Sequence, residues 1–334
     1  RRCSVIVMEN VKCILSSQTV NGLIFHEILH DLEKSGYQVY SLVKPRVSGD
    51  RPDPHDFIIK AEEYGVPQAR HRVIILGVRK DINKIPRTLK KSSRVSVGEV
   101  INGLPRLRSG LSKHSKENTG AKWAEIIHEG MVPVLKHLAS KDLTKKIRES
   151  LEKINDHTLT QGGKWTPTPP SFINMPAHLA EWYSDSNMDG VCNHDTRGHM
   201  DSDLARYLFC ASYAEINKHS DIRMSPKLND FPDTLLPDHK NAKSGKFVDR
   251  FKVQEKHHPA STITSHISKD GHYFIHYDPT QCRSLTVREA ARIQTFPDNY
   301  FFEGNRTEQY TQVGNAVPPL LANQIASVVY SLLK

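Results

Sequence analysis

The sequence has few cysteines and lacks the motifs of several common classes of protein. Its 334 residues include five cysteines, an odd number without the spacing of a disulfide framework, so we expect reduced thiols in a cytoplasm. No Gly-x-Gly-x-x-Gly or phosphate-loop motif appears, which argues against the usual dinucleotide and P-loop sites. No secretory signal opens the sequence, and no apolar run is long enough to predict a membrane span.

Charge is the most unusual bulk property that is present. The formal net charge is +9 and the pI is about 9.2, which favours a polyanionic partner such as nucleic acid. Residues 79–94 contain seven basic residues and one acidic residue. The alternative is that the charge only keeps the protein soluble. With 37% apolar and 25% charged residues, the composition is that of a globular protein with a hydrophobic core.

The first eighty residues predict an α/β unit. A short apolar strand, "SVIVM", ends just before Glu9, and a helix is expected from Asn21, as its N-cap, to a stop at Gly36. A further strand, "YQVYSLV", follows, and Val73–Gly77 reads as a strand buried on both faces. Strands that alternate with a helix predict a parallel, doubly wound sheet, with ligands beyond the carboxyl ends of its strands.

The rest of the chain is less regular. A helical stretch near 123–154 is expected to be interrupted at Pro133, and the region 95–255 otherwise reads as an insertion with many loops. Regular structure is expected to return near 261–278 and in a helix at 286–296. The chain closes with a glycine-asparagine loop that runs into an apolar helix, with Pro318 and Pro319 at its start.

Histidines and cysteines in the middle region do not predict a metal site. Cys192, His194, His199 and Cys210 match no usual zinc spacing, so we expect no metal. The eighteen histidines are instead interpreted as part of a polar surface that faces nucleic acid in places.

Three hydrogen-bonding side chains stand at alternate positions where the buried strand begins. Gln68, Arg70 and Arg72 lead into Val73–Gly77, and alternate positions on an extended chain point to the same side. The pattern therefore predicts a polar pocket at the mouth of a core strand.

Four blocks of sequence resemble the DNA cytosine-5 methyltransferases. They occur in the family's order: "ENV" after a strand, "EYGVPQARHRVIILG", "RSLTVREAARIQTFPDNYFF" and "QVGNAVPPLLANQIA". The resemblance implies part of a doubly wound, Rossmann-like α/β methyltransferase sheet, together with an irregular α+β target recognition domain. It divides the chain into catalytic residues 1–88, recognition residues 89–271 and a return segment, residues 272–334, that completes the catalytic domain.

The resemblance also implies roles for individual residues. Glu9 would hydrogen-bond the ring nitrogen and amine of a cytosine rotated out of the duplex, and Arg72 would contact the base carbonyl. Base-pocket and DNA contacts are implied for Asn10, Gln68 and Arg70, and the basic run adds Lys90 and Lys91. Contacts to S-adenosylmethionine are implied for Asn315, Ala316 and Val317.

Two motifs of the family are missing from this sequence. The nucleophilic cysteine of a proline-cysteine-glutamine loop and the phenylalanine-x-glycine-x-glycine cofactor turn normally precede "ENV", and the sequence begins at Arg1 rather than with methionine. We therefore expect a subunit or fragment whose nucleophile comes from an absent segment or a partner polypeptide, and which is inactive as this chain alone. The alternative is a non-catalytic DNA-binding homologue that recruits or regulates a partner.

The resemblance implies a setting as well. We expect a bacterial, cytoplasmic, nucleoid-associated protein that acts in restriction–modification or another phage-defence system, or as an unpaired methylase. The recognised DNA sequence does not follow from one sequence.

Overall fold

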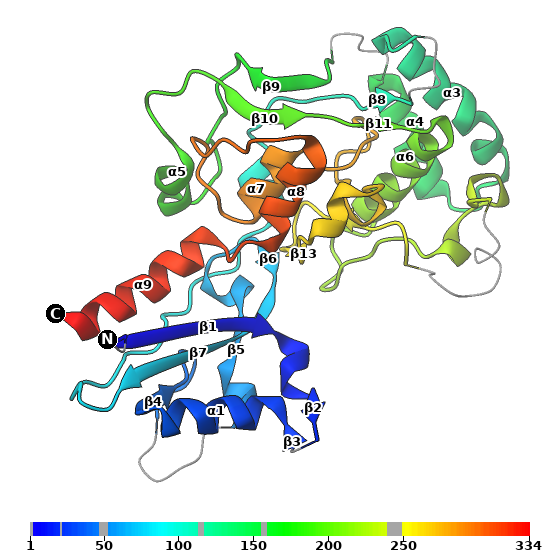
Figure 1. The fold of residues 1–334 in the computed structure, drawn as a ribbon. Helices are drawn as coiled ribbons and strands as arrows, with labels where there is room; N and C mark the ends of the chain where they lie inside the picture. Colours follow the sequence, from blue (N-terminus) through cyan, green and yellow to red (C-terminus); the bar gives the residue numbers. More distant parts are fainter. Residues whose placement is uncertain (1–2, 21, 47–52, 113–116, 155–158, 239–248) are drawn as a thin grey trace. The chain divides into compact units, whose positions relative to one another are not determined.

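The computed structural model describes residues 3–20, 22–46, 53–112, 117–154, 159–238 and 249–334 (Figure 1). The chain forms two compact units. The first unit contains Arg1–Val95 and Val317–Lys334, and the second contains Ser96–Ala316. Residues 272–316 thus lie with the middle of the chain, whereas the sequence analysis grouped them with the catalytic segment. The functional assignment of the segments stays a prediction.

The first unit is a small sheet with a helix on each face. Its strands and α-helices are β1 (Val5–Val11), β2 (Gln18–Thr19), β3 (Gly22–Leu23), α1 (Ile24–Lys34), β4 (Tyr37–Tyr40), β5 (Ile58–Lys60), β6 (Gln68–Ala69), β7 (His71–Arg79) and α9 (Pro319–Leu333). Short 3-10 helices are η1 (Lys12–Leu15), η2 (Pro54–Phe57) and η3 (Ala61–Tyr64).

The sheet is antiparallel, so the predicted parallel pairing is wrong. β7 lies in the centre and pairs antiparallel with β1, β4 and β5. Only ten residues, 61–70, join β5 to β7, which is too short for the crossover that a parallel pair needs. β1 and β4 run in the same direction, because both are antiparallel to β7. The predicted strand–helix–strand unit is therefore present, but β7 is inserted between its two strands.

The prediction that residues 73–77 are buried on both faces is confirmed. Val73 and Ile75 pack with Phe25 and Leu29 of α1 in one apolar cluster. On the other face, Ile74, Leu76 and Val78 pack in a second cluster with α9. The α9 residues of that cluster are Leu321, Ile325, Val328 and Leu332. Alternate residues of one strand thus hold α1 and α9 on opposite faces (Figure 1).

The first helix begins later than predicted. Asn21, the expected N-cap, lies outside the described residues; α1 begins at Ile24 after Leu23, whose side chain makes no capping hydrogen bond. The predicted stop at Gly36 fits, since α1 ends at Lys34 and Gly36 has a positive φ of 91°.

The second unit combines α-helices and short strand pairs with long irregular segments. Its elements are α2 (Val97–Ile101), β8 (Gly110–Leu111), α3 (Gly120–His137), α4 (Lys141–Lys153), β9 (Gly162–Thr166), α5 (Ala177–Tyr183), β10 (Val191–Asp195), β11 (Gly198–His199), α6 (Asp201–Ile216), β12 (Val253–Gln254), β13 (Ala260–Ser261), β14 (Ile275–His276), α7 (Val287–Ile293) and α8 (Arg306–Asn315). The 3-10 helices are η4 (Leu228–Asp230), η5 (Asp233–Leu235), η6 (Ser265–Ser268) and η7 (His272–Phe274).

Two boundaries in this unit differ from the predictions. Pro133 lies inside α3 without ending it; the break comes at Leu138, and Ser140 then caps α4 by accepting a hydrogen bond from the backbone of Leu143. Gly314 and Asn315 form the last residues of α8 rather than a loop. The predicted helix at 286–296 is confirmed as α7, whose capping box joins Thr286 and Glu289.

Four histidines that were expected at the surface belong instead to a buried polar network. His194, His199, His272 and His276 are all buried, so the surface interpretation is wrong for these four. His194 contacts Thr286 and the carbonyl of Pro105, with both ring nitrogens used. Likewise, Nδ1 of His276 accepts from the backbone of Asp278, while Nε2 lies 3.5 Å from Glu289. Arg283 holds Glu289 through two contacts of 2.7 Å.

This network predicts loss of stability in mild acid. Burial lowers the pKa of His194 and of His276 from 6.5 to about 4. The unfolded chain therefore binds more protons than the folded chain between these values, and the free energy of unfolding falls as pH drops from 6.5 towards 4. Each histidine should account for about 1–3 kcal/mol. Urea unfolding across this range should show the decline, and His276→Gln should make it less steep; an equal slope would contradict the assignment.

One segment passes a test for membrane spans by length and composition alone. Arg306–Leu333 has a window of mean hydropathy 1.4. Core helices of soluble proteins pass the same test, and here α8 ends at Asn315 before α9 begins at Pro319, so this is weak support for a membrane span.

Candidate functional site

An ion pair between β1 and β7 forms the centre of the candidate site. Nε of Arg72 lies 3.0 Å from Oε1 of Glu9, and the two side chains are 17% and 30% exposed. The backbone of Arg72 faces Val11 of β1 on one side and Ile59 of β5 on the other. Nη1 of Arg72 also donates to the carbonyl of His71 at 2.9 Å. The guanidinium is therefore held by Glu9 of β1 and by the carbonyl of His71, while part of the pair stays open to solvent.

Arg70 belongs to the same electrostatic group. It is buried, and its pKa is lowered to about 10, first by burial and then by the charge of Arg72, against the opposing effect of Glu9. Two guanidinium groups and one carboxylate thus leave a net positive site, which suits a polar or anionic ligand.

Gln68 and Asn10 are placed differently from each other. Gln68 is fully buried in β6, just before the site. Asn10 follows Glu9 in β1, and its side-chain oxygen accepts from the backbone of Val11 at 2.8 Å. The structure therefore brings Glu9, Arg70 and Arg72 together, with Gln68 as buried support and Asn10 turned to its own backbone.

The opposite side of β7 carries a pair that the sequence analysis missed. Nε2 of His71 lies 2.7 Å from Oε1 of Glu62, which is buried in η3. His71 alternates with Arg70 and Arg72, so its side chain points away from theirs. The alternation was visible in the sequence, but nothing there identified Glu62 as the partner.

A groove of about 610 Å³ runs beside Glu9. It is lined by apolar residues of β1, β7 and α9 together with Val317. Of the three residues implied to bind cofactor, the structure therefore places Val317 in one groove with Glu9. Asn315 and Ala316 end α8 in the second unit, where the carbonyl of Ala316 accepts from Gln294 at 2.6 Å.

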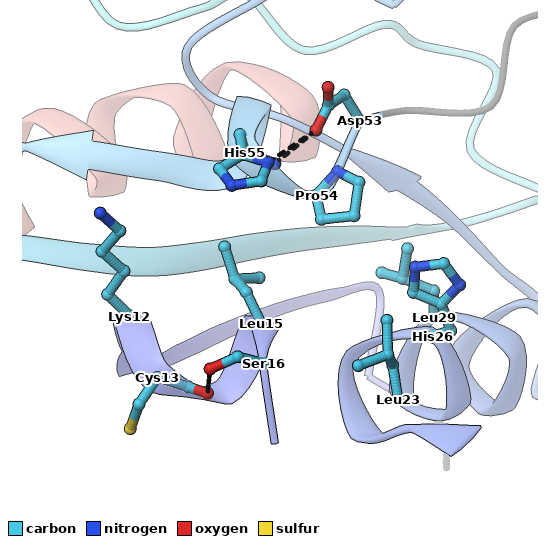
Figure 2. A pocket seen from close by; sticks show the side chains of 10 residues that line it. All are labelled: Lys12, Cys13, Leu15, Ser16, Leu23, His26, Leu29, Asp53, Pro54 and His55. Atoms are coloured by element: carbon cyan, nitrogen blue, oxygen red, sulfur yellow. Dashed lines mark hydrogen bonds and ion pairs between the residues drawn. The ribbon is translucent and has the colours of Figure 1, made fainter. Parts of the chain in front are cut away.

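A second hollow in the first unit, of about 940 Å³, holds none of the predicted site residues (Figure 2). His55 pairs with Asp53 at 3.1 Å on one side of it. Cys13 lines the other side, and Figure 2 shows its sulfur directed away from this pair. The Cys13 thiol is therefore not directed at His55, the histidine of this hollow that a carboxylate orients.

Three of the remaining four cysteines are unsuited to nucleophilic attack. Cys3 is exposed, whereas Cys192, Cys210 and Cys282 are buried, and burial raises the pKa of each of these three thiols. A raised pKa keeps a thiol protonated at neutral pH and therefore unreactive.

Lys90 and Lys91, the two lysines of the basic run that were predicted to contact DNA, differ in their surroundings. Both are exposed, but Nζ of Lys91 pairs with Glu63 at 2.6 Å, whereas Lys90 has no ion-pair partner within the described parts of the chain. Part of the charge of Lys91 is thus already balanced, and Lys90 is better placed to meet a phosphate.

This difference gives a test of the basic run. If it lies on DNA, affinity should fall with salt with a log–log slope of about −0.9 per phosphate neutralised. Lys90→Glu should flatten the slope clearly and Lys91→Glu less, with sequence preference nearly unchanged in both. Filter-binding titrations at several salt concentrations measure the slope. Equal slopes for both variants and the unchanged chain would show that this run faces away from DNA.

Comparisons with known proteins agree with one another. The pattern of the family described as "C-5 cytosine-specific DNA methylase" matches residues 1–331. The chain is 35% identical over 327 residues to the type II methyltransferase M.Bpa9945I of Bacillus paralicheniformis, covering 98% of this chain and 60% of that protein. It is 26% identical to the type II methyltransferase M.DdeI of Desulfomicrobium norvegicum, covering 96% of this chain and 61% of that protein.

More distant relatives are similar over much of the chain. DNA (cytosine-5)-methyltransferase 1 of Gallus gallus is 26% identical, covering 80% of this chain and 19% of that protein. A solved structure titled as a prophage-encoded DNA modification methyltransferase (E. coli) aligns over 99% of this chain and 70% of its own, with 18% identity and a TM-score of 0.49. The chain thus spans about 60% of the length of the first two relatives named above.

Proposed function

The chain belongs to the C-5 cytosine-specific DNA methylase family, and we propose that it supplies the base-binding and DNA-binding part of an enzyme that methylates carbon 5 of cytosine in duplex DNA. The observation that carries this proposal is the Glu9–Arg72 pair, which is partly open to solvent and has the buried Arg70 as an electrostatic neighbour.

The pair suits the edge of a cytosine. Arg72 offers N–H donors to the base carbonyl, while Glu9 accepts from the exocyclic amine and, when protonated, donates to the ring nitrogen. In the structure the two groups hold each other at 3.0 Å. An entering base would take over hydrogen bonds that the pair now makes. A base must leave the stack to reach such a site, and its unstacking costs a few kcal/mol.

Glu9 would also contribute to the chemistry. A proton shared with the ring nitrogen withdraws electrons from the ring and makes carbon 6 open to attack by a thiolate. Three of the five cysteines are buried with a raised pKa, Cys13 is directed away from His55, and Cys3 lies just ahead of β1, the strand that carries Glu9 itself. We therefore propose that the nucleophile comes from another segment of the protein or from a partner polypeptide.

S-adenosylmethionine would supply the methyl group when bound. The groove beside Glu9 offers Val317 and apolar side chains of α9 as one wall of a site. Its apolar lining provides no charged partner for the cofactor's amino-acid end except Glu9. Asn315 and Ala316 remain candidates for that end, and the rest of the site would have to come from elsewhere.

The same groove is the proposed attachment surface for that other segment. Val7 of β1 is 44% exposed, and Tyr330 and Leu333 of α9 are 60% and 57% exposed. Within the described residues, β1 pairs with β7 along one edge only. An unpaired strand edge beside exposed apolar side chains favours the addition of further strands. The relatives' greater length is consistent with this.

The relatives also suggest a setting. Several carry the name type II methyltransferase, so we propose a role in bacterial restriction–modification, in the cytoplasm and on the nucleoid. We further propose that the first unit carries the base pocket and that the second unit, which includes the predicted recognition region, reads the DNA. Transfer of labelled methyl groups to duplex DNA, by this chain together with the proposed segment, tests the whole assignment.

A further inference from the structure

One of the three tryptophans in the second unit is exposed, whereas the indoles of the other two are hydrogen-bonded within the unit. Trp123 is buried and donates its indole N–H to Ser109 at 2.9 Å. Trp182 donates its indole N–H to the carbonyl of Thr295, also at 2.9 Å. Trp165, in contrast, is 47% exposed, and its indole makes no hydrogen bond with any described residue. Tryptophan combines a large apolar face with an N–H donor, and for this reason it is enriched where proteins contact other molecules.

The exposed ring is nevertheless held in place. Trp165 lies in β9 opposite Cys192 of the buried strand β10. A Cβ atom added at Gly190 would lie 2.5 Å from Cζ2 of the indole and 2.5 Å from the carbonyl oxygen of Thr166. Only glycine therefore lets the ring rest against the chain at this point. One side of the indole packs on Gly190, and the rest is presented to solvent.

The surroundings of Trp165 suit a polyanion better than an apolar protein surface. No acidic residue occurs from Leu159 to Ala180, and the neighbouring Lys164 is exposed. β9 is an outer strand, since it pairs with β10 alone among the described strands. β9 itself carries a lysine beside the ring and no carboxylate, while the exposed Asp189 precedes Gly190 in the chain. The strand, rather than the segment before Gly190, is therefore the part that can approach a phosphate backbone.

We propose that Trp165 is a DNA contact of the second unit: its indole stacks on a base exposed in the DNA, and its N–H is available to a phosphate or a base edge. This inference rests on the proposed function, because base flipping leaves neighbouring bases unstacked. An aromatic side chain that covers such a base recovers part of the lost stacking, and it does so for any base.

The test uses tryptophan fluorescence and filter binding on the same samples. The chain, co-expressed with the segment that the proposed function requires, is titrated with random-sequence duplex DNA. It is then titrated with the same duplexes carrying an abasic nucleotide in place of a cytosine. DNA should quench part of the emission, more strongly with the abasic duplexes, and Trp165→Phe should abolish that quenching. The matched control, Trp182→Phe, should retain it.

The affinity for DNA should depend on an aromatic ring at position 165 and not only on apolar area there. Trp165→Leu should weaken binding about 5- to 100-fold, and Trp165→Phe, which keeps an aromatic face, should weaken it less. If DNA binds fully while Trp165→Phe leaves the quenching unchanged, the inference is overturned and the proposed function stands. If the unchanged complex binds no DNA at all, the proposed function fails and this inference fails with it. Should Trp165→Leu be unstable, the quenching difference between the two phenylalanine variants decides.

Discussion

Incubated with 5-fluorocytosine DNA and S-adenosylmethionine, this chain alone should give no covalent protein–DNA band on a denaturing gel. Trapping requires a thiolate that adds to carbon 6, and the structure offers none with suitable surroundings. Cys13 points away from His55, and three other cysteines are buried with a raised pKa. We expect no detectable band for this chain alone and a fully labelled band for a complex that supplies the thiolate.

Co-expression with a segment that carries the proline-cysteine-glutamine and cofactor motifs should restore trapping. It should restore solubility and binding of S-adenosylmethionine at the same time, because one groove beside β1 and α9 would serve both purposes. Substituting Val7 by Asp in that groove should prevent the recovery without changing Glu9 or Arg72. A shifted band from the chain by itself would overturn the proposal and point to one of its five cysteines as the nucleophile.

In the reconstituted complex, Glu9→Gln should lower the methylation rate by about 10²-fold or more, the usual contribution of a placed general acid. Glutamine keeps the size of the side chain and some hydrogen bonding, but it cannot supply a proton. It also weakens the contact with Arg72, now at 3.0 Å, that orients both groups. Affinity for duplex DNA should change little, since by the proposed function the pair would contact the base and not the phosphates.

A matched control for this variant is Glu62→Gln. Glu62 is also a carboxylate in contact with a residue of β7, but it pairs with His71 on the other side of the strand. Its replacement should affect stability more than the methylation rate. Arg72→Lys, which keeps the charge and loses the forked donors, should reduce the rate as well. Turnover of Glu9→Gln at the unchanged rate would show that this glutamate is not the proposed acid, and would favour a non-catalytic DNA-binding homologue.

The sequence predicted local features of the first unit well. Residues 73–77 were expected to be buried on both faces, and they are. A strand that lies between two helices needs apolar side chains on both of its faces. The stop of α1 near Gly36 followed from the need for a positive φ at that position. The sequence signals for such features lie in residues close together in the chain, even where a distant element such as α9 covers one face.

Pairing between distant segments could not be predicted. The sequence favoured a parallel sheet because strands and a helix alternate, but the order of strands depends on which distant edges meet. β7 takes the place between β1 and β4 and pairs with both. Likewise, His276 was predicted to lie at the surface, but it is buried beside Glu289, which Arg283 contacts in turn. These partners lie too far along the chain for the sequence to reveal them.

The candidate site shows the same division. The alternation of Gln68, Arg70 and Arg72, with Glu9 at the end of an earlier strand, placed four polar side chains where strands begin or end, and the resemblance to a family gave them roles. Periodicity fixes which side of a strand a residue faces, so the sequence by itself determined which residues were candidates. Only the tertiary structure decided that Glu9 meets Arg72 at 3.0 Å, that Glu62 turns to His71 and that Lys91 is balanced by Glu63. Each of these contacts depends on the register between strands or on the path of a loop, which is set by the packing of the whole unit and not by neighbours in the chain.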